Sequence, residues 1–229
     1  MVMTWIKICG TTNLEDALTA CDAGADALGF VFADSPRRID PKLAAEIIRK
    51  LPEKVEKVGV FVNERSGRIR EIVKQAALTA VQLHGNESGE FAEKLFADMQ
   101  EDRPRLYRAL TMSTMFSAAN ATASLRAQRA KPLFDALLVD SGSSRGGGTG
   151  LTFDWDRAQP FIVGLKKTGK VIVAGGLTPQ NVARAIQMFQ PWGVDVASGV
   201  EAEPGKKDPE KVRAFVKAVR EADGRRSHK

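Results

Sequence analysis

The 229-residue sequence has only two cysteines, Cys9 and Cys21, and no apolar segment that approaches the roughly 20 residues needed to cross a bilayer. Two cysteines in a chain of this length do not suggest a disulfide framework, and their spacing is not that of structural zinc ligands. Lys7 interrupts the first apolar run before it reaches the length of a signal-peptide core. These absences predict a cytoplasmic protein without membrane association and without a metal centre.

Concentrated positive charge is scarce before the end of the chain. The formal net charge is +6, and Arg225, Arg226 and Lys229 in the terminal GRRSHK supply three of these charges. Nucleic-acid binding would need basic residues interleaved with aromatic residues on one face, so the sequence does not favour it. The weak basic balance elsewhere suits phosphorylated or carboxylated small molecules.

Short apolar runs alternate with segments of helical periodicity, which is typical of repeated βα units around a parallel sheet. The expected strands are 5–9, 27–32, 57–62, 80–84, 105–110, 136–140, 170–174 and 193–197. The expected helices are 14–23, 41–51, 65–77, 88–99, 113–129, 154–166, 179–188 and 208–221. Helix starts are indicated by Asn13 with Asp16, by Thr178 before Pro179 and by Asp208 before a second proline.

Eight such units predict an α/β fold, a single-domain (β/α)₈ TIM barrel, compact against the roughly 250 residues typical of that fold. An open doubly wound sheet is the alternative. The first expected strand is followed by one glycine rather than by a G-x-G-x-x-G fingerprint, which counts against that alternative. We expect the barrel to occupy residues 1–222 and residues 223–229 to form a frayed basic tail.

Polar side chains stand at the ends of the expected strands, where a barrel places its chemistry. They include Cys9, His84, Asp140 and, in the loop after the second strand, Arg37. Each has a simpler interpretation: a buried cysteine packs as a small apolar residue, and a histidine or a loop arginine is often only structural or solvated. Asp140 is hard to explain in this way, because a carboxylate that ends an apolar strand needs a partner.

Three glycine-rich loops follow the sixth, seventh and eighth expected strands. Glycine lets backbone N–H groups approach a phosphate without obstruction by a Cβ atom, and barrels often bind phosphate after their last strands. One such loop alone would more often be a linker, whereas three successive loops indicate a phosphate site. The candidate residues are Gly147, Gly148, Gly175, Gly176, Ser198 and Gly199.

As a set, the motifs resemble the phosphoribosylanthranilate isomerase family. They are KICGTTNLEDA, GADALGFVFADSPRRI, VGVFVNE, VQLHG, LLVDS, GGGTGLTFDW, AGGLTPQNV and GVDVASGVEAEPGKKD, in the order that the family has them. The likeness extends nearly end to end, although residues 98–135 contain no usable motif. It implies a barrel that performs the Amadori rearrangement of N-(5-phosphoribosyl)anthranilate in tryptophan biosynthesis, without metal or organic cofactor.

The resemblance implies roles for individual residues. Cys9 would be the general base and Asp140 the general acid, while Arg37, rather than Arg38, would meet the anthranilate carboxylate. Relatives that also isomerise the histidine-pathway analogue use an aspartate as this base, so Cys9 indicates the enzyme with one substrate.

We also expect His84 and Asp195 on the anthranilate side of the site and the glycine loops around the phosphate. The partner would be a phosphorylated small molecule, and the chain would act as a monomer or homodimer.

These residue types suit the chemistry independently of the resemblance. An acid must protonate the ring oxygen, and a base must then remove the C2 proton of the iminium. Burial would raise the pKa of Asp140, and the helix that begins after Cys9 would help the thiol to ionise.

Two other functions fit a phosphate-binding barrel. A non-catalytic sensor of a phosphorylated ligand would need the glycine loops, but it would not need both Cys9 and Asp140. Another enzyme of this fold, such as indole-glycerol-phosphate synthase, would show a set of lysine and glutamate residues at the strand ends. The strand ends of this sequence lack that set.

Overall fold

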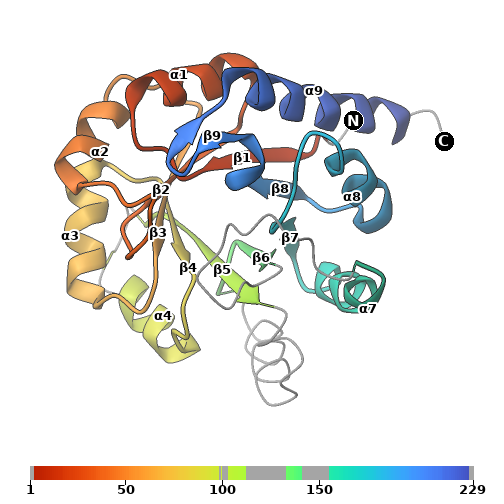
Figure 1. Ribbon diagram of the computed structural model, residues 1–229. Helices are drawn as coiled ribbons and strands as arrows, with labels where there is room; N and C mark the ends of the chain where they lie inside the picture. The colour runs from red at the N-terminus through yellow and green to blue at the C-terminus, as the bar shows by residue number, and fades with distance from the viewer. Residues whose placement is uncertain (1–2, 98, 100–102, 112–132, 141–154, 227–229) are drawn as a thin grey trace.

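Eight parallel strands close into a barrel in chain order, so that β1 pairs with both β2 and β8 (Figure 1). The computed structural model describes residues 3–97, 99, 103–111, 133–140 and 155–226. The strands are β1 (Trp5–Cys9), β2 (Ala27–Val31), β3 (Glu56–Phe61), β4 (Ala80–Leu83), β5 (Arg105–Thr111), β6 (Ala136–Asp140), β7 (Lys170–Val173) and β8 (Gly193–Val196). The predicted eightfold barrel is confirmed, and each strand agrees with its expected range to within one residue at either end.

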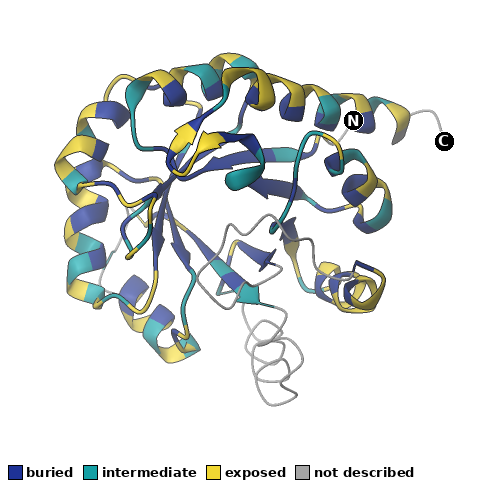
Figure 2. Cartoon of the chain, in the orientation of Figure 1, coloured by how far each residue is buried: buried dark blue, intermediate teal, exposed yellow. Residues whose placement is uncertain are grey.

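Helices surround the barrel and turn their buried faces toward the strands (Figures 1 and 2). They are α1 (Leu14–Ala23), α2 (Pro41–Ile48), α3 (Ser66–Ala76), α4 (Gly89–Ala97), α7 (Trp155–Lys166), α8 (Val182–Phe189) and α9 (Pro209–Arg226). The helix expected at 113–129 lies outside the described residues. Among the helices that are described, none combines the length and the apolar character that a membrane crossing requires.

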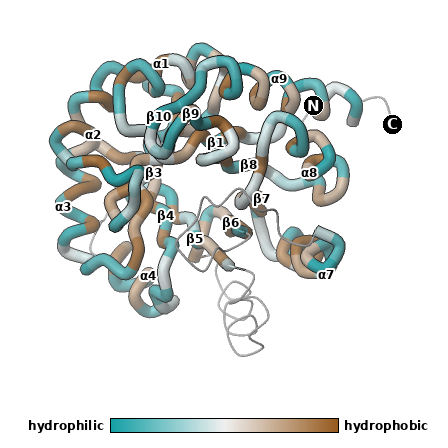
Figure 3. The backbone as a smooth tube through the Cα atoms, in the orientation of Figure 1, coloured by the Kyte–Doolittle hydropathy of each residue, from teal (hydrophilic) through white to brown (hydrophobic). Residues whose placement is uncertain are grey.

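The alternation of side chains along each strand separates two apolar cores. The larger core lies between strands and helices, and the smaller core fills the interior of the barrel. The interior residues are Ala27, Val58, Ala80, Tyr107, Ala109, Ala136, Leu138, Ile172 and Ala174. Figure 3 shows hydrophobic residues along the strands, whereas the helices alternate between hydrophobic and hydrophilic residues. The interior is therefore a packed core, although it also contains the polar side chain of Lys7 at the middle of β1 and the hydroxyl of Tyr107, which donates to Glu56 at the amino end of β3.

Two of the three predicted helix starts are confirmed. The side chain of Asn13 accepts a hydrogen bond from the backbone N–H of Asp16, and Asp208 caps α9 by accepting from residues 210 and 211. The third prediction is wrong, because α8 begins at Val182 rather than at Pro179. The side chain of Asn181 accepts from the N–H of residue 178 and donates to the carbonyl of Gly176, which holds this segment as a turn.

A small hairpin after β8 was not expected from the sequence. The 3₁₀ turn η1 (Ser198–Val200) leads into β9 (Glu201–Glu203), which pairs antiparallel with β10 (Lys206–Lys207). The hairpin is anchored on the loop after β1, where the hydroxyl of Thr12 donates to the carbonyl of Gly205 at 2.5 Å. It is also anchored on α1, because the N–H of Lys207 donates to Asp16 at 2.7 Å. The last glycine-rich segment therefore packs on the loop after β1 and on the first turn of α1.

The end of the folded part lies beyond the expected boundary at Ala222, because α9 continues to Arg226. Asp223 is buried, and its carboxylate accepts hydrogen bonds from the backbone N–H of Thr4 at 2.9 Å and from the Thr4 hydroxyl at 2.5 Å. Arg220 donates to the carbonyl of Thr4 at 2.6 Å. These contacts join the last helix to the residue that precedes β1.

Replacing Asp223 by alanine should lower the free energy of unfolding by about 1–3 kcal/mol, because the buried N–H and hydroxyl of Thr4 would lose their acceptor. Chemical denaturation measures the loss, and Glu221→Ala, at an exposed position of the same helix, should change little. For the same reason, a chain ending at Ala222 should be less stable than one ending at Arg226. Equal stability of the two truncated chains would show that the contact between Asp223 and Thr4 contributes nothing.

Candidate functional site

The carboxyl ends of β1 and β6 bring the predicted base and acid to the same rim of the barrel. Cys9 is the last residue of β1 and Asp140 is the last residue of β6. Both are nearly buried, with 8% of Cys9 and 9% of Asp140 exposed to solvent. Asp140 follows the interior residue Leu138 by two positions, and this spacing turns its side chain toward the inside of the barrel.

A buried ion pair lies one layer below Cys9. Lys7 and Asp195 occupy paired positions of β1 and β8, and Lys7 Nζ lies 2.9 Å from Asp195 Oδ1. Lys7 is 0% exposed, and although burial lowers its pKa, Asp195 and then Cys9 raise that pKa to about 12. Asp195 was expected on the anthranilate side of the site, and that role toward a substrate stays a prediction. The structure adds that the carboxylate of Asp195 contacts the ammonium group of Lys7.

The ionisation of Cys9 is governed by burial and by neighbouring charges. Burial raises the pKa of the Cys9 thiol above its usual value, and Lys7 opposes this effect both by its charge and by a hydrogen bond. The net shift is upward, because burial outweighs the effect of Lys7. Among the charged groups around Cys9, the ammonium group of Lys7 does most to stabilise the ionised sulfur.

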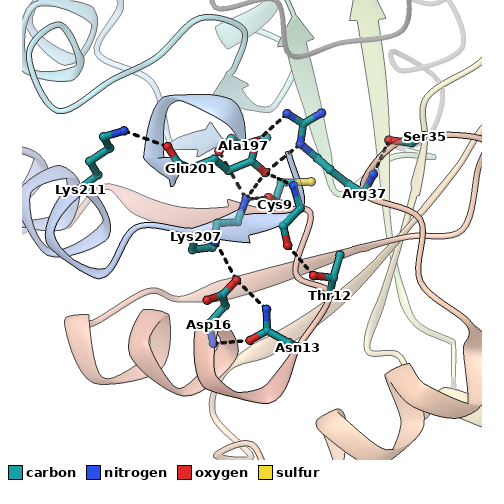
Figure 4. A network of polar contacts seen from close by, with 11 residues as sticks. Cys9, Thr12, Asn13, Asp16, Ser35, Arg37, Ala197, Glu201, Lys207 and Lys211 are labelled. Atoms are coloured by element: carbon teal, nitrogen blue, oxygen red, sulfur yellow. Dashed lines mark hydrogen bonds and ion pairs between the residues drawn. The ribbon is translucent and has the colours of Figure 1, made fainter. Parts of the chain in front are cut away.

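Arg37 reaches the rim from the loop after β2 and is held by a carboxylate of the hairpin (Figure 4). Its Nε and Nη2 atoms donate to the two oxygens of Glu201 at 2.8 and 2.6 Å, and both residues are buried. This hydrogen-bonded pairing raises the pKa of Arg37, which is therefore a permanent cation. Its Nη1 edge makes no hydrogen bond with the described residues, so that edge can bind a second carboxylate.

Lys207 joins this pair to the end of β1. Its ammonium group donates to the carbonyl oxygen of Cys9 at 2.6 Å, to that of Ala197 at 3.3 Å and to Glu201 Oε1 at 2.9 Å. Although burial alone would raise the pKa of Glu201, the hydrogen bond from Arg37 and the charge of Lys207 lower it. Figure 4 shows both cations directed toward Glu201. One buried carboxylate thus fixes the cation of the β2 loop relative to the end of β1.

His84 follows β4 and lies beside the predicted acid. Its Nε2 atom is 3.4 Å from Asp140 Oδ2, and its Nδ1 atom is 2.8 Å from the side-chain nitrogen of Gln82. If this nitrogen of Gln82 donates to Nδ1, the neutral imidazole carries its proton on Nε2, which faces Asp140. Gln82 Oε1 is buried and lacks a hydrogen-bond partner among the described residues. The structure thus places His84 next to Asp140, and its role toward a substrate stays a prediction.

Two of the three expected phosphate loops are described, and they contact each other. A Cβ atom at Gly199 would lie 1.8 Å from the carbonyl oxygen of Leu177, so only glycine permits this approach between the loops after β7 and β8. Gly175 and Gly176 have φ angles of 81° and 66°, in the left-handed region that glycine adopts readily. Gly147 and Gly148 lie outside the described residues. The structure brings Gly175, Gly176, Ser198 and Gly199 into neighbouring loops at one side of the rim.

Several residues of this site were not identified from the sequence. Three of them lie within the family motifs but were not singled out there: Lys7, Glu201 and Lys207. Charged residues are mostly exposed, so composition alone would place these side chains on the surface. A useful signal was present for Lys7, because a lysine two residues before an inward-facing strand end must share its face. Within the described part of the chain, no three His, Cys, Asp or Glu side chains gather as metal ligands would.

Comparison with known proteins gives consistent matches over almost the whole chain. Residues 6–218 match the family model described as N-(5′-phosphoribosyl)anthranilate (PRA) isomerase. The N-(5′-phosphoribosyl)anthranilate isomerase of Pelobacter propionicus is 45% identical over 221 residues, which cover 96% of this chain and 97% of that protein.

Two solved structures show the same similarity. The phosphoribosyl anthranilate isomerase of Thermotoga maritima is 39% identical, with a TM-score of 0.81 and coverage of 96% of this chain and 100% of the other. A phosphoribosyl anthranilate isomerase in complex with reduced 1-(o-carboxyphenylamino)-1-deoxyribulose 5-phosphate is 38% identical, with a TM-score of 0.78 and the same coverage.

Replacing Glu201 by glutamine should lower the free energy of unfolding by about 3–5 kcal/mol, because Arg37 and Lys207 would stay buried without their shared anion. Glu203→Gln, at an exposed position of the same hairpin, is the matched control. Because the folded-state pKa of Glu201 is lowered, its contribution is present above its unfolded pKa and is lost as the pH falls. The difference between wild type and Glu201→Gln should therefore shrink below about pH 4. Equal stability of the two glutamine variants at neutral pH would contradict this role.

Proposed function

Because this chain belongs to the N-(5′-phosphoribosyl)anthranilate isomerase family, we propose that Cys9 and Asp140 perform the acid–base steps of that isomerisation. The reaction converts N-(5′-phosphoribosyl)anthranilate into 1-(2-carboxyphenylamino)-1-deoxyribulose 5-phosphate, an intramolecular aldose–ketose isomerisation of tryptophan biosynthesis. The observation that carries the assignment is that an ionisable thiol and a carboxyl group lie at the same rim of the barrel. They approach that rim on β1 and β6, two strands that are not neighbours in the barrel.

The proposed steps move protons without net gain or loss. Asp140 gives its proton to the ring oxygen as the C1–O bond breaks, which leaves a protonated imine between C1 and the anthranilate nitrogen. The Cys9 thiolate then removes the proton from C2, and the C2–H electron pair forms the C1–C2 double bond of an enolamine. A proton returns to C1 and another leaves the C2 hydroxyl group, so that the product is a ketone.

The proposed site binds the two ends of the substrate with different residues of the rim. Arg37 contacts the anthranilate carboxylate through the edge that Glu201 leaves open, and His84 and Asp195 lie toward the same end of the substrate. The phosphate lies at the other end, where glycine-rich loops offer backbone N–H groups. The proposed phosphate ligands are Gly147, Gly148, Gly175, Gly176, Ser198 and Gly199.

We also place the reaction in the cytoplasm. The proposed base is a thiol, and both described cysteines are free. A reducing compartment keeps thiols free, whereas an oxidising one would favour their oxidation.

Turnover is followed by the loss of anthranilate fluorescence after addition of freshly made N-(5′-phosphoribosyl)anthranilate. Cys9→Ser should lower kcat by roughly 10² to 10⁴ while changing KM little, because a serine hydroxyl does not ionise near neutral pH. Cys21→Ser, at the other free cysteine, should retain wild-type turnover and is the matched control. If Cys9 serves only as a packing residue, Cys9→Ser will keep nearly full turnover and show a lower melting temperature. That result would end the assignment of Cys9 as base.

Replacing Arg37 by alanine should weaken substrate binding by roughly 1.5–3 kcal/mol, the range for hydrogen bonds to charged groups. Arg38→Ala should do much less, because Arg38 is exposed. The measurement is the affinity for the product and for a product analogue that lacks the carboxylate. The Arg37 variant should bind the two compounds with similar affinity, whereas wild type should prefer the compound with the carboxylate. A preference that survives in Arg37→Ala would move the carboxylate contact to another residue.

A further inference from the structure

The interior of the barrel holds a cation directly below the proposed base. Lys7 and Cys9 are two residues apart on β1, so their side chains project from the same face of the strand. Lys7 is the only lysine among the described residues with no exposed surface at all, and a charge in such a position requires a functional or structural reason. Its ammonium group donates to Asp195 Oδ1 at 2.9 Å, and the nearby thiol of Cys9 also raises its pKa.

Gly29 of β2 provides the space in which the two side chains meet. A Cβ atom at Gly29 would lie 2.7 Å from Cys9 Sγ and 3.0 Å from Lys7 Cε. Both atoms therefore lie close to one point above this glycine, on the strand that pairs with Cys9 itself. Because any larger residue would displace the sulfur or the lysine stem, the glycine preserves their contact.

Two other cations near Cys9 share one carboxylate of the hairpin, so that cluster keeps one positive charge in excess. Arg37 and Lys207 approach from the β2 loop and from β10, and both are paired with Glu201. Lys207 contacts the backbone carbonyl of Cys9 rather than being paired with its sulfur. Asp195, from β8, opposes ionisation of the thiol but is itself neutralised by Lys7. Although the charge of Lys207 also favours the thiolate, Lys7 favours it most, and the Lys7 side chain meets the sulfur over Gly29.

We propose that Lys7 is a positioning residue for the reaction, whose ammonium group holds and stabilises the Cys9 thiolate while Asp195 keeps that ammonium group in place. This inference rests on the proposed role of Cys9 as the general base. When the thiolate takes the C2 proton and becomes neutral, Lys7 retains Asp195 as its counter-ion. Lys7 therefore has a counter-ion whether the sulfur is a thiolate or a thiol, and the buried cation is never left without an anion.

The two partners of Lys7 predict opposite effects on Cys9. Because Lys7 favours the thiolate, Lys7→Met should raise the pKa of the Cys9 thiol; because Asp195 disfavours it, Asp195→Asn should lower that pKa. We expect the thiolate fraction at a fixed pH below the pKa to fall roughly tenfold or more in Lys7→Met, which corresponds to one pKa unit. A pair of charges that does not act on the sulfur would leave the pKa of the thiol unchanged in both variants.

The experiment uses the Cys21→Ser chain, in which Cys9 is the only thiol, and follows the ultraviolet absorbance of the thiolate against pH. Lys57→Met is the matched control, because Lys57 is a buried lysine whose ammonium group donates to the carbonyls of residues 52 and 53, away from the barrel interior. It should leave the pKa of Cys9 unchanged. An unchanged pKa in Lys7→Met would overturn the proposal, whether or not the variant loses activity.

A second variant keeps the test decisive if Lys7→Met fails to fold with Asp195 unpaired. In Lys7→Met/Asp195→Asn both charges are absent, and the pKa of Cys9 should still exceed that of wild type, because Lys7 acts on the thiol more strongly than Asp195 does. A pKa equal to or below that of wild type would overturn the proposal.

The pH profile of kcat/KM separates this proposal from the role of Cys9 itself. A base must be deprotonated, so kcat/KM should rise with pH as Cys9 ionises, and this limb should move in each variant together with the pKa of the thiol. If the pKa of the thiol moves and the limb does not, Cys9 is not the base and the inference falls with it. If neither the pKa of the thiol nor the limb moves, Lys7 does not act on the thiol. That result would overturn the role of Lys7 and leave the role of Cys9 as base intact.

Discussion

The closure of the barrel depends on the contact between its first and last strands, and the ion pair between Lys7 and Asp195 lies across that contact. The two residues are register partners of β1 and β8, and their charges lie inside the barrel rather than on its surface. An isolated charge in such a position would be strongly unfavourable, so each residue requires the other. The pair fixes the register in which the end of β1, and with it Cys9, meets the loop after β8.

A second set of buried charges organises the rim above this pair. Glu201 receives Arg37 and Lys207, and Lys207 also binds the carbonyl of Cys9. The hairpin that supplies Glu201 and Lys207 begins at Glu201, five residues after the last residue of β8, so the last βα connection holds the loops that follow the first two strands. The consequence is a site whose cation is oriented before any substrate binds, which reduces the ordering that binding requires.

Apolar runs were sufficient to predict the eight strands, because parallel strands covered by helices are hydrophobic on both faces. Cap residues such as Asn13 also predicted helix starts, since a cap is a local interaction. The start of α8 could not be predicted, because Asn181 uses its side chain to close a turn with Gly176. The hairpin and the charges on Glu201 and Lys207 could not be predicted either, since their partners lie in distant parts of the chain.

The central claim is that Cys9 removes the C2 proton and that Asp140 opens the ring. The most direct test compares residual turnover of Cys9→Ser and Asp140→Asn with substrate that carries deuterium or hydrogen at C2. Proton removal should limit the rate in the Cys9 variant, which should show a primary isotope effect, whereas ring opening should limit the Asp140 variant and abolish that effect. An isotope effect confined to Asp140→Asn would contradict the account.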